Sequence, residues 1–507
     1  MYFESTRGFE KGISSAKAIK QGIAEDGGLF VPSNDVNISI EDIGNMLEMS
    51  YNSRAKFILS KFLTDFSSVD LEECVDGAYS FPKFDNEKIA PLVKLNSTMS
   101  VLELWHGPTS AFKDMALQIL PRLLVKSVKM TGEENEMVIL VATSGDTGKA
   151  ALEGFKDVPG TRIIVFYPVD GVSEVQRKQM ITQEGLNVEV CAITGNFDDA
   201  QNGVKDIFGD KELSEKMLAS GFKLSSANSI NWGRLVPQIV YYFSGYLDMI
   251  SNGTIILGEE INVVVPTGNF GNILAAYYAK KMGLPIKKMI CASNENNVLS
   301  DFINTGKYSR NREFHTTSSP SMDILISSNL ERLLYLLSDR DSEVVSNLME
   351  ELAKNGEYNV PENVFARISE EFFGGWATEQ ETFEQIKRLY NENKYLVDTH
   401  TAVGFEVYNK YLLTTGDVST KAMIVSTASP FKFNSSVCMS IFGKEKIAGM
   451  NEFEMLGYLS RQTGVRIPEG LLNLAEKTET YNGVCEKVQM KAVLINNLET
   501  RKKWNLT

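Results

Sequence analysis

Hydrophobic residues in the middle of the chain come in short, mostly apolar runs bounded by turn residues. Residues 137–142, 162–167 and 261–266 are such runs, each about six residues long. Runs of this length are typical of strands buried in a parallel sheet. Between the runs, apolar residues recur every three or four positions, which predicts helices. The alternation predicts parallel α/β units.

The α/β pattern begins near residue 92. Its helix at 113–130 contains Pro121, which we expect to kink the helix because proline lacks a backbone N–H. At 295–415 the pattern gives way to a polar, almost wholly helical stretch, and helices also dominate the C-terminal part. The predicted strands are 99–104, 137–142, 162–167, 188–193, 261–266, 286–292 and 421–426, and the other helices are 148–155, 174–184, 231–250 and 272–282.

Residues 1 to about 90 precede this pattern and are predicted to be mostly helical. Helices are expected at 14–22 and across 40–63, where apolar residues keep helical spacing. Between these two helical stretches, a glycine turn at 26–28 precedes a short apolar stretch at 29–31. The charged residues 85–88 mark a boundary before the α/β pattern starts.

Composition narrows the classes of function. A chain of 507 residues is too long for one hydrophobic core and is expected to form several domains. Its net charge of −14 argues against nucleic acid or an anionic membrane as the main partner, because both require a basic face. No apolar run reaches membrane-spanning length, and the N-terminus resembles no signal or transit peptide. Five scattered cysteines and only three histidines favour no disulfide framework and no metal site, so we expect a reducing cytoplasm.

Two glycine-containing turns follow predicted buried strands and precede helices. In PTGNFGN (residues 266–272), the glycines allow close approach of backbone N–H groups, and the helix N-terminus that follows favours an anion. ATSGDTG (142–148) is built in the same way, and its hydroxyls suit a carboxylate or a phosphate. Neither turn has the spacing of a dinucleotide-binding loop or a P-loop. Taken alone, PTGNFGN is explained equally well as a structural turn.

Three other turns carry candidate functional residues. Asn228, Ser229 and Arg234 precede a long helix and can bind one anion, although taken alone they fit better as a helix N-cap with a surface arginine. Thr427 ends a predicted strand, at the edge where open α/β sheets bind ligands; its hydroxyl can bond a ring nitrogen or simply satisfy a turn. HGPTSAFKD (106–114) places Lys113 at a helix start, where most lysines are merely solvated.

Together these motifs resemble the threonine synthase family of fold-type II pyridoxal-phosphate enzymes. The resemblance runs through nearly the whole chain and is least informative at 330–395. At 427–430 the chain reads Thr-Ala-Ser-Pro where many members read Thr-Ala-His-Pro, so no role for that histidine is carried over. Besides the motifs above, the resemblance includes STRG (5–8), EDGGL (25–29), NSINWGRL (228–235), SMDI (321–324), DTHTAVG (398–404) and STASPFKF (426–433).

The resemblance implies an α/β fold with two open, parallel-sheet domains and the cofactor between them, plus a mostly helical N-terminal domain. On this basis, residues 1–90 are expected to form the N-terminal cap domain and residues 131–234 a small α/β domain. Residues 91–130 and 235–507 are expected to form the large cofactor-binding α/β domain, with a helical insertion at about 300–415. The protein is expected to be a monomer or a homodimer.

The resemblance also implies roles for single residues. Lys113 is expected to carry pyridoxal 5'-phosphate as a Schiff base, and Thr427 to contact the ring nitrogen of that cofactor. His106 and His400 lie in matched motifs and are expected to support loop geometry. Gly268, Asn269, Phe270, Gly271 and Asn272 are expected to bind the cofactor phosphate, and Ser144, Asp146, Thr147, Asn228, Ser229 and Arg234 the carboxylate and phosphate of the substrate.

The implied activity is that of a carbon–oxygen lyase acting on a phosphate ester, by which O-phospho-L-homoserine and water give L-threonine and phosphate. Lys113, displaced by the substrate amine, is expected to act as general base at Cα and then at Cβ. A related phospho-lyase that releases 2-oxobutyrate, and a non-catalytic protein that binds a phosphorylated metabolite, are open alternatives. General α,β-elimination is disfavoured by the cluster of Asn228, Ser229 and Arg234.

Overall fold

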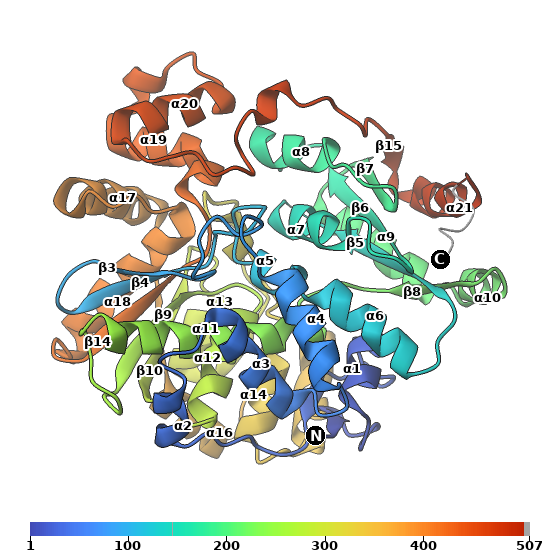
Figure 1. The fold of residues 1–507 in the computed structure, drawn as a ribbon, viewed down its shortest axis with the longest axis horizontal. Coiled ribbons are helices and arrows are strands. Elements are labelled where there is room, and N and C mark those ends of the chain that lie inside the picture. The colour runs from blue at the N-terminus through green and yellow to red at the C-terminus, as the bar shows by residue number, and fades with distance from the viewer. Residues whose placement is uncertain (144, 501–507) are drawn as a thin grey trace.

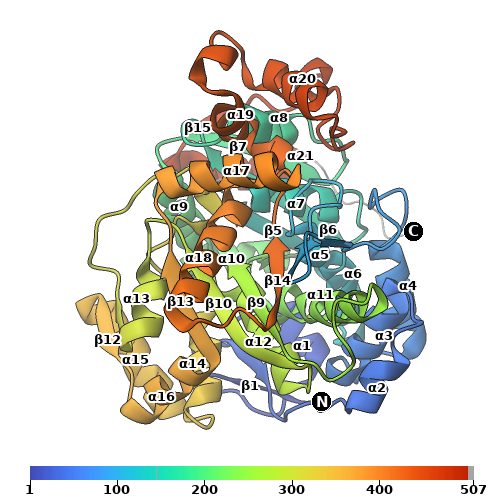
Figure 2. The ribbon, with the colours of Figure 1, turned by 90° about the vertical axis from the view of Figure 1, so that its left-hand side faces the viewer.

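The computed structural model of the protein describes residues 1–143 and 145–500. Within these residues the parallel strands lie in two sheets, a larger and a smaller one, and the short helix α5 (Asp114–Leu117) lies between them (Figure 1). The first helices of the chain and the helices α19 (Asn434–Phe442) and α20 (Glu452–Thr463) lie at opposite ends of the molecule (Figure 2). The predicted α/β architecture is therefore confirmed.

The larger sheet has, in the described part of the chain, the strand order β13-β10-β9-β14-β4-β3. Its pairings are parallel except at one edge, where β3 and β4 are antiparallel. Strand β9 is buried over its whole length, as its apolar sequence predicts for a strand with both faces covered. The strands are β3 (Leu92–Lys94), β4 (Met99–Glu103), β9 (Ile261–Pro266), β10 (Ile286–Ser293), β13 (Phe372–Trp376) and β14 (Lys421–Ser426).

The smaller sheet has the order β15-β7-β6-β5-β8 within the described residues, and its pairings are parallel. Strand β15 comes from the C-terminal part of the chain, so the chain returns to this sheet after it has completed the larger one. The strands are β5 (Glu136–Ala142), β6 (Thr161–Pro168), β7 (Val188–Thr194), β8 (Phe222–Ser225) and β15 (Val484–Glu486), and the nearby helices are α7 (Asp146–Phe155), α8 (Glu174–Ile181), α9 (Phe197–Gly209), α10 (Lys211–Ala219) and α21 (Met490–Thr500).

The N-terminal segment is largely helical, as predicted. The stretch 40–63 forms two helices rather than one, because the chain leaves the helical path near Met46 and starts again after Ser50, whose side chain caps the second helix. The strands β1 and β2 pair antiparallel. The elements are β1 (Phe3–Ser5), α1 (Ser15–Gln21), β2 (Phe30–Pro32), α2 (Ile40–Asn45), α3 (Tyr51–Phe62) and α4 (Ser68–Ala78).

The helix predicted at 113–130 is also divided in two. Helix α5 ends at Leu117, and α6 (Leu120–Met130) starts three residues later. Pro121 is the second residue of α6, where its missing N–H leaves no hydrogen bond unmade. Pro121 therefore lies at the start of a helix and does not kink one. The short helix α5 begins directly after Lys113.

The stretch 295–415 is not wholly helical, which corrects the prediction. Strand β13 pairs with β10 at the edge of the larger sheet, and β11 pairs with β12. How the chain divides into domains stays a prediction. The elements of this stretch besides β13 are α13 (Val298–Thr305), β11 (Lys307–Ser309), η1 (Pro320–Met322), α14 (Leu330–Leu337), α15 (Ser342–Asn355), β12 (Glu357–Asn359), α16 (Glu362–Glu371), α17 (Glu379–Asn393) and α18 (Thr399–Thr415).

Helix α11 (Trp232–Ser251) connects the N-terminal helices to the centre of the molecule. It contacts α3, α5 and α12 (Gly271–Lys281), and almost all of its residues are buried. Such a helix, covered nearly all round, positions its side chains rigidly, which matters for those that face the site. The remaining elements are η2 (Pro430–Phe433), α19 (Asn434–Phe442), η3 (Lys444–Ile447), α20 (Glu452–Thr463), η4 (Leu474–Glu476) and η5 (Lys487–Gln489).

Two further features concern the class of protein. No helix among residues 1–143 and 145–500 combines the length and the apolar character that crossing a membrane requires. All five cysteines of the sequence lie in the described residues, and all are buried free thiols.

Candidate active site

The loop that carries Lys113 lies against the loop that follows β14. The N–H of Phe112 donates to the carbonyl of Thr427 at 2.8 Å, and the N–H of Ser429 donates to the carbonyl of Ser110 at 3.0 Å. Backbone pairing of this kind fixes the two loops relative to each other. The structure thus brings together Lys113 and Thr427, which are far apart in the sequence.

Lys113 is almost fully buried, with 8% of its surface exposed. Its Nζ donates to Ser321 Oγ at 3.0 Å and lies 3.5 Å from Asp146 Oδ2. Burial lowers the pKa of Lys113, and the positive charges of Lys432 and Arg234 act in the same direction, against the attraction of Asp146. A buried amine with a lowered pKa is suited to act as a nucleophile and a base.

Asp146 is the acidic partner in this cluster. Its Oδ1 lies 2.6 Å from Lys432 Nζ and accepts a hydrogen bond from Gln176 Nε2 at 2.9 Å. Burial alone would raise the pKa of Asp146, but the charges of Lys432 and Lys113 outweigh burial and hold it below its usual range. An ionised carboxylate only accepts hydrogen bonds. The contacts of Asp146 therefore suit a cationic neighbour and do not support its predicted part in binding the substrate's carboxylate and phosphate.

The glycine loop at 268–272 lies against Ser321, the residue that accepts the hydrogen bond from Lys113. A Cβ added to Gly268 would lie 2.4 Å from the Ser321 carbonyl oxygen, so only glycine fits this approach. Phe270 has φ +63° and ends the loop, and α12 starts at Gly271. The first N–H groups of a helix are free to bind an anion. The exposed Asn269 is tied by its carbonyl to Asn329.

Asn272 presents a buried donor at the start of α12. Its Oδ1 accepts hydrogen bonds from the hydroxyls of Tyr241 and Tyr242, each at 2.6 Å. With the amide in this orientation, its nitrogen has no hydrogen-bond partner among the described residues. An unpaired buried N–H is costly unless a ligand accepts from it.

Arg234, on the first turn of α11, is buried to 96% and is not a surface residue. Its Nη1 donates to the carbonyl of Ala227 at 2.6 Å, and its Nε has no partner in residues 1–143 and 145–500. Burial lowers the pKa of Arg234 to about 10. A buried guanidinium without a carboxylate partner favours binding of an anion.

The positions of the other predicted substrate-binding residues do not decide their roles. Asn228 is exposed, and Ser229 and Thr147 are half-buried. Asn231, not Asn228, is the N-cap of α11, with Oδ1 accepting from the Gly233 N–H at 2.8 Å. Ser144 lies outside the described residues. The roles of these residues stay predictions.

Three residues that the sequence did not single out as site residues complete the cluster. Ser321, in η1, accepts the hydrogen bond from Lys113, and His400 accepts one from the N–H of Ser321. Lys432, in η2, pairs with Asp146. All three belong to motifs that carry the resemblance, and this membership could have marked them as site residues. A motif does not, however, show which atoms are in contact.

His106 supports loop geometry in a definite way. Its Nδ1 lies 2.5 Å from Asp85 Oδ1, and its Nε2 lies 2.9 Å from Glu103 Oε2. Burial lowers the pKa of His106, but both carboxylates raise it, with a net rise to about 9. A histidine that stays protonated between two carboxylates is an ion-pair bridge and not a proton-transfer group at neutral pH.

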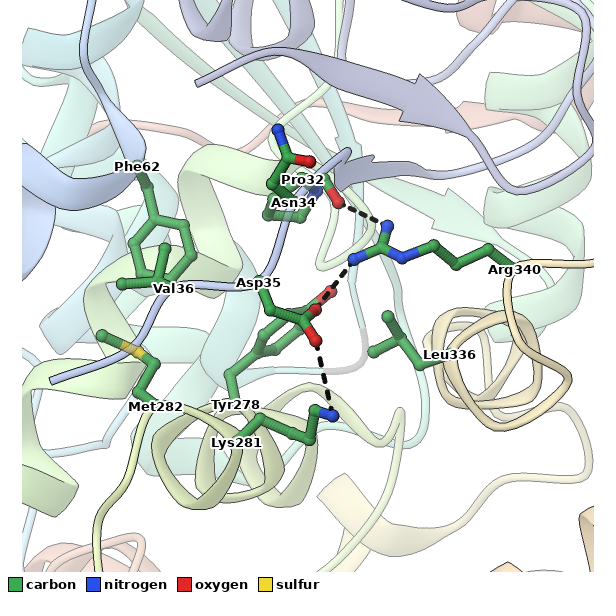
Figure 3. Close-up of a pocket in the computed structure, with 10 residues that line it drawn as sticks. All are labelled: Pro32, Asn34, Asp35, Val36, Phe62, Tyr278, Lys281, Met282, Leu336 and Arg340. Atoms are coloured by element: carbon green, nitrogen blue, oxygen red, sulfur yellow. Dashed lines mark hydrogen bonds and ion pairs between the residues drawn. The ribbon is translucent and has the colours of Figure 1, made fainter.

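A small pocket between the N-terminal segment and α12 is a different feature (Figure 3). Two cations line it, Arg340 and Lys281, and both pair with Asp35, at 2.9 and 3.4 Å. Arg340 also pairs with Glu4, at 3.1 Å. Two carboxylates therefore balance these two cations, and neither is left free for an anionic ligand, in contrast to the cluster around Lys113.

The residues near Lys113 fit pyridoxal phosphate. The buried amine of Lys113 suits an aldehyde. The unpaired nitrogen of Asn272 and the N-terminus of α12 suit a phosphate. Thr427, held beside Lys113, has a neutral hydroxyl that suits a ring nitrogen.

The sequence is similar to those of known proteins. The family model described as "Threonine synthase N terminus" matches residues 2–79, and the model described as "Pyridoxal-phosphate dependent enzyme" matches residues 85–429. Threonine synthase of Saccharomyces cerevisiae is 36% identical over 468 residues, which cover 87% of this chain and 89% of the yeast protein. Human threonine synthase-like 1 is 39% identical over 440 residues, 85% of this chain, but the match spans only 58% of that longer protein.

Solved structures share the fold. The structure of pyridoxal-phosphate-bound threonine synthase from Brucella melitensis has a TM-score of 0.87 and 35% identity, covering 99% of this chain and 100% of that one. Threonine synthase from Escherichia coli has a TM-score of 0.75 and 29% identity, covering 98% and 100%. The cofactor bound in the Brucella melitensis structure is the one that the residues around Lys113 fit.

Proposed function

Because the chain belongs to the threonine synthase family of pyridoxal-phosphate-dependent enzymes, we propose that it converts O-phospho-L-homoserine and water to L-threonine and phosphate. The reaction joins β,γ-elimination of phosphate to addition of water at Cβ. Pyridoxal phosphate is the cofactor.

The observation that carries the proposal is a buried excess of positive charge beside Lys113. Among the described residues, Asp146, Lys432 and Arg234 are the charged groups that act most strongly on Lys113, so the amine faces two cations and one carboxylate. The chain as a whole carries a net charge of −14. Buried positive charge is costly unless an anion balances it, and a phosphate ester is such an anion.

Lys113, the 268–272 loop, Asn272 and Thr427 would hold the cofactor. When bound, pyridoxal phosphate supplies an aldehyde that links to amines and a ring that takes up negative charge from the substrate carbon. The protein supplies binding and orientation. The helix N-terminus and the nitrogen of Asn272 would neutralise the cofactor phosphate, and the hydroxyl of Thr427 would meet the ring nitrogen without forcing it to keep a proton.

Lys113 moves the protons. Its lowered pKa allows the amine to lose its proton closer to neutral pH than an exposed lysine does, as a general base requires. The hydrogen bond of Nζ to Ser321 Oγ limits where the amine points. From there Lys113 would take the proton from Cα of the substrate and then act at Cβ.

Arg234 would bind the phosphate of the substrate. Its free Nε and its guanidinium plane can make paired hydrogen bonds to two phosphate oxygens. The hydrogen bond to the Ala227 carbonyl fixes the side chain before substrate arrives, so little orientation is lost on binding.

A second candidate is a phospho-lyase that eliminates phosphate and releases 2-oxobutyrate. It stays open because the chain is also similar to threonine synthase-like 1, a name that does not state threonine synthesis for that protein. Both reactions use the same amine and the same anion site, so the residues above support either one.

Product analysis separates the candidates. The purified protein, loaded with cofactor, is incubated with O-phospho-L-homoserine, and phosphate, threonine and 2-oxobutyrate are quantified. The proposal predicts threonine and phosphate in equal amounts. Phosphate accompanied by 2-oxobutyrate would instead support the phospho-lyase, and release of neither product would favour the non-catalytic binding protein.

We further propose a cytoplasmic location and a monomer or homodimer. The free, buried thiols of all five cysteines, which lie in the described residues, support a reducing compartment. The partner is the small-molecule substrate, and the acidic net charge gives no support to nucleic acid or a membrane surface.

A further inference from the structure

Lys432 is the most deeply buried cation of the cluster, with 1% of its surface exposed. Its Nζ lies 2.6 Å from Asp146 Oδ1 and donates to the carbonyl of Thr109 at 3.0 Å. A lysine is rarely buried so fully, since its charge loses the hydration of water and must be compensated by the protein. The two contacts supply that compensation, and they fix the position of the charge.

Asp146 links Lys432 to Lys113. One carboxylate oxygen meets Lys432, and the other lies 3.5 Å from Lys113 Nζ. The two lysines therefore share one carboxylate. The shorter contact is the one with Lys432. The charge of Lys432 therefore largely neutralises Asp146, and Lys113 is attracted less strongly than it would be by an unpaired carboxylate.

No second carboxylate among the described residues pairs with Lys113 Nζ. Arg234 adds a second positive charge that acts on the amine. Ser321 Oγ is a neutral partner, and the ring of Phe112 lies 5.0 Å from Nζ. The adjacent Asp114 turns to Thr109, whose N–H and Oγ1 donate to its two oxygens at 2.8 Å each.

We propose that Lys432 is a positioning residue which neutralises Asp146 and so keeps Lys113 able to give up its proton. The inference rests on the proposed function only in that Lys113 is the cofactor lysine. Lys432 touches neither substrate nor cofactor in this account. It acts on Lys113 through Asp146 and through the charge that it holds in the same buried space.

The direction in which the pKa at Lys113 Nζ shifts can be measured. Replacing Lys432 by a neutral residue leaves Asp146 free to stabilise the protonated, positively charged form at Lys113. The proton at Lys113 Nζ is then lost at higher pH. An opposite charge within about 4–6 Å shifts a buried group by about 1–3 pH units, so the change should be well above the error of a titration.

The test uses the holoenzyme without substrate. The visible absorbance of the cofactor attached to Lys113 is titrated with pH in the wild type, Lys432→Met and Lys432→Arg. We expect the midpoint of Lys432→Met to rise by about one pH unit or more, and that of Lys432→Arg, which keeps the charge, to stay within about half a unit of the wild type. An unchanged midpoint in Lys432→Met would overturn the proposal, and so would an equal rise in both variants, since packing and not charge would then be responsible.

A second pair of variants covers the case in which Lys432→Met does not bind cofactor. Asp146→Asn alone is expected to lower the midpoint, because attraction is lost while Lys432 stays charged. The double variant Asp146→Asn/Lys432→Met removes one charge of each sign and is expected to return towards the wild-type midpoint. A double variant that falls as far as Asp146→Asn would show that Lys432 has no influence and would overturn the proposal. Because the titration needs no substrate, its result is independent of whether the wild type makes threonine.

Discussion

The backbone N–H of Ser321 donates a hydrogen bond to Nε2 of His400 across 3.2 Å. Because Nε2 accepts, the ring proton is on Nδ1, which lies 2.7 Å from Asp398 Oδ2. Ser321 Oγ in turn accepts from Lys113 Nζ. His400 therefore holds in place the residue that orients the lysine.

Replacing His400 by leucine should loosen this arrangement. The N–H of the half-buried Ser321 would lose its acceptor, which costs about 1 kcal/mol. We expect a comparable fall in the free energy of unfolding, measured with urea, and a higher dissociation constant for the cofactor. His400→Gln is the control, because its side-chain oxygen can take the place of Nε2 and should preserve most of both quantities. Equal behaviour of the two variants would show that the acceptor atom has no role.

The 268–272 loop offers a matched pair of alanine substitutions. The added Cβ of Gly268→Ala would lie 2.4 Å from the Ser321 carbonyl oxygen, whereas that of Gly271→Ala would meet nothing closer than 3.5 Å. Overpacking costs about 1–3 kcal/mol. We therefore expect cofactor affinity to fall by about 10- to 100-fold in Gly268→Ala and to change little in Gly271→Ala. The dissociation constant of pyridoxal phosphate, measured by dialysis, checks this, and equal losses would contradict the close approach at residue 268.

Arg234→Ala should weaken the binding of O-phospho-L-homoserine while the cofactor stays bound. Loss of a charged hydrogen bond of about 1.5–3 kcal/mol raises the KM for the substrate by about 10- to 100-fold. Cofactor absorbance in the same preparation shows whether pyridoxal phosphate is retained. Arg234→Lys, which keeps a charge but loses Nε, should recover only part of the affinity. If Arg234→Ala loses the cofactor, Arg234 has been assigned to the wrong phosphate.

Thr427→Asp tests the neutral partner predicted for the ring nitrogen. A carboxylate at this buried position, where Thr427 is 6% exposed, would hold the ring nitrogen protonated and change the chemistry at the substrate carbon. We expect threonine formation to fall at least 10-fold. Thr427→Ser keeps a hydroxyl and should retain most of the rate. Full threonine formation by the aspartate variant would refute the assignment of Thr427.

The strands that are buried on both faces could be predicted closely from the sequence. β5, predicted at 137–142, begins one residue earlier at Glu136, because unbroken apolar runs mark such strands directly. β13 was missed because its Gly374 and Gly375 look like a turn in the sequence. The structure explains them as sites of close packing, since a Cβ at Gly374 would lie 2.8 Å from the Ser300 carbonyl oxygen.

The candidate site was predictable as a set of motifs but not as a set of contacts. Glycines, hydroxyls and Lys113 stand at strand ends, and that pattern is visible locally. That Arg234 is buried and not on the surface depends on packing around α11, which no local pattern contains. The hydrogen bond from Lys113 to Ser321 joins residues 208 positions apart. Lys432 likewise meets Asp146 only because the chain returns from β14 to the same space.

The assignment of Lys113 as the lysine that holds pyridoxal phosphate can be tested directly on the protein. The holoenzyme is reduced with borohydride, which makes the attachment permanent, and the cofactor is located by mass spectrometry of the peptides. Lys432, in the same cluster, and Lys149, three residues after Asp146, serve as internal controls. The account predicts the cofactor on Lys113 alone. Cofactor on Lys432 or Lys149 with Lys113 unmodified would contradict it.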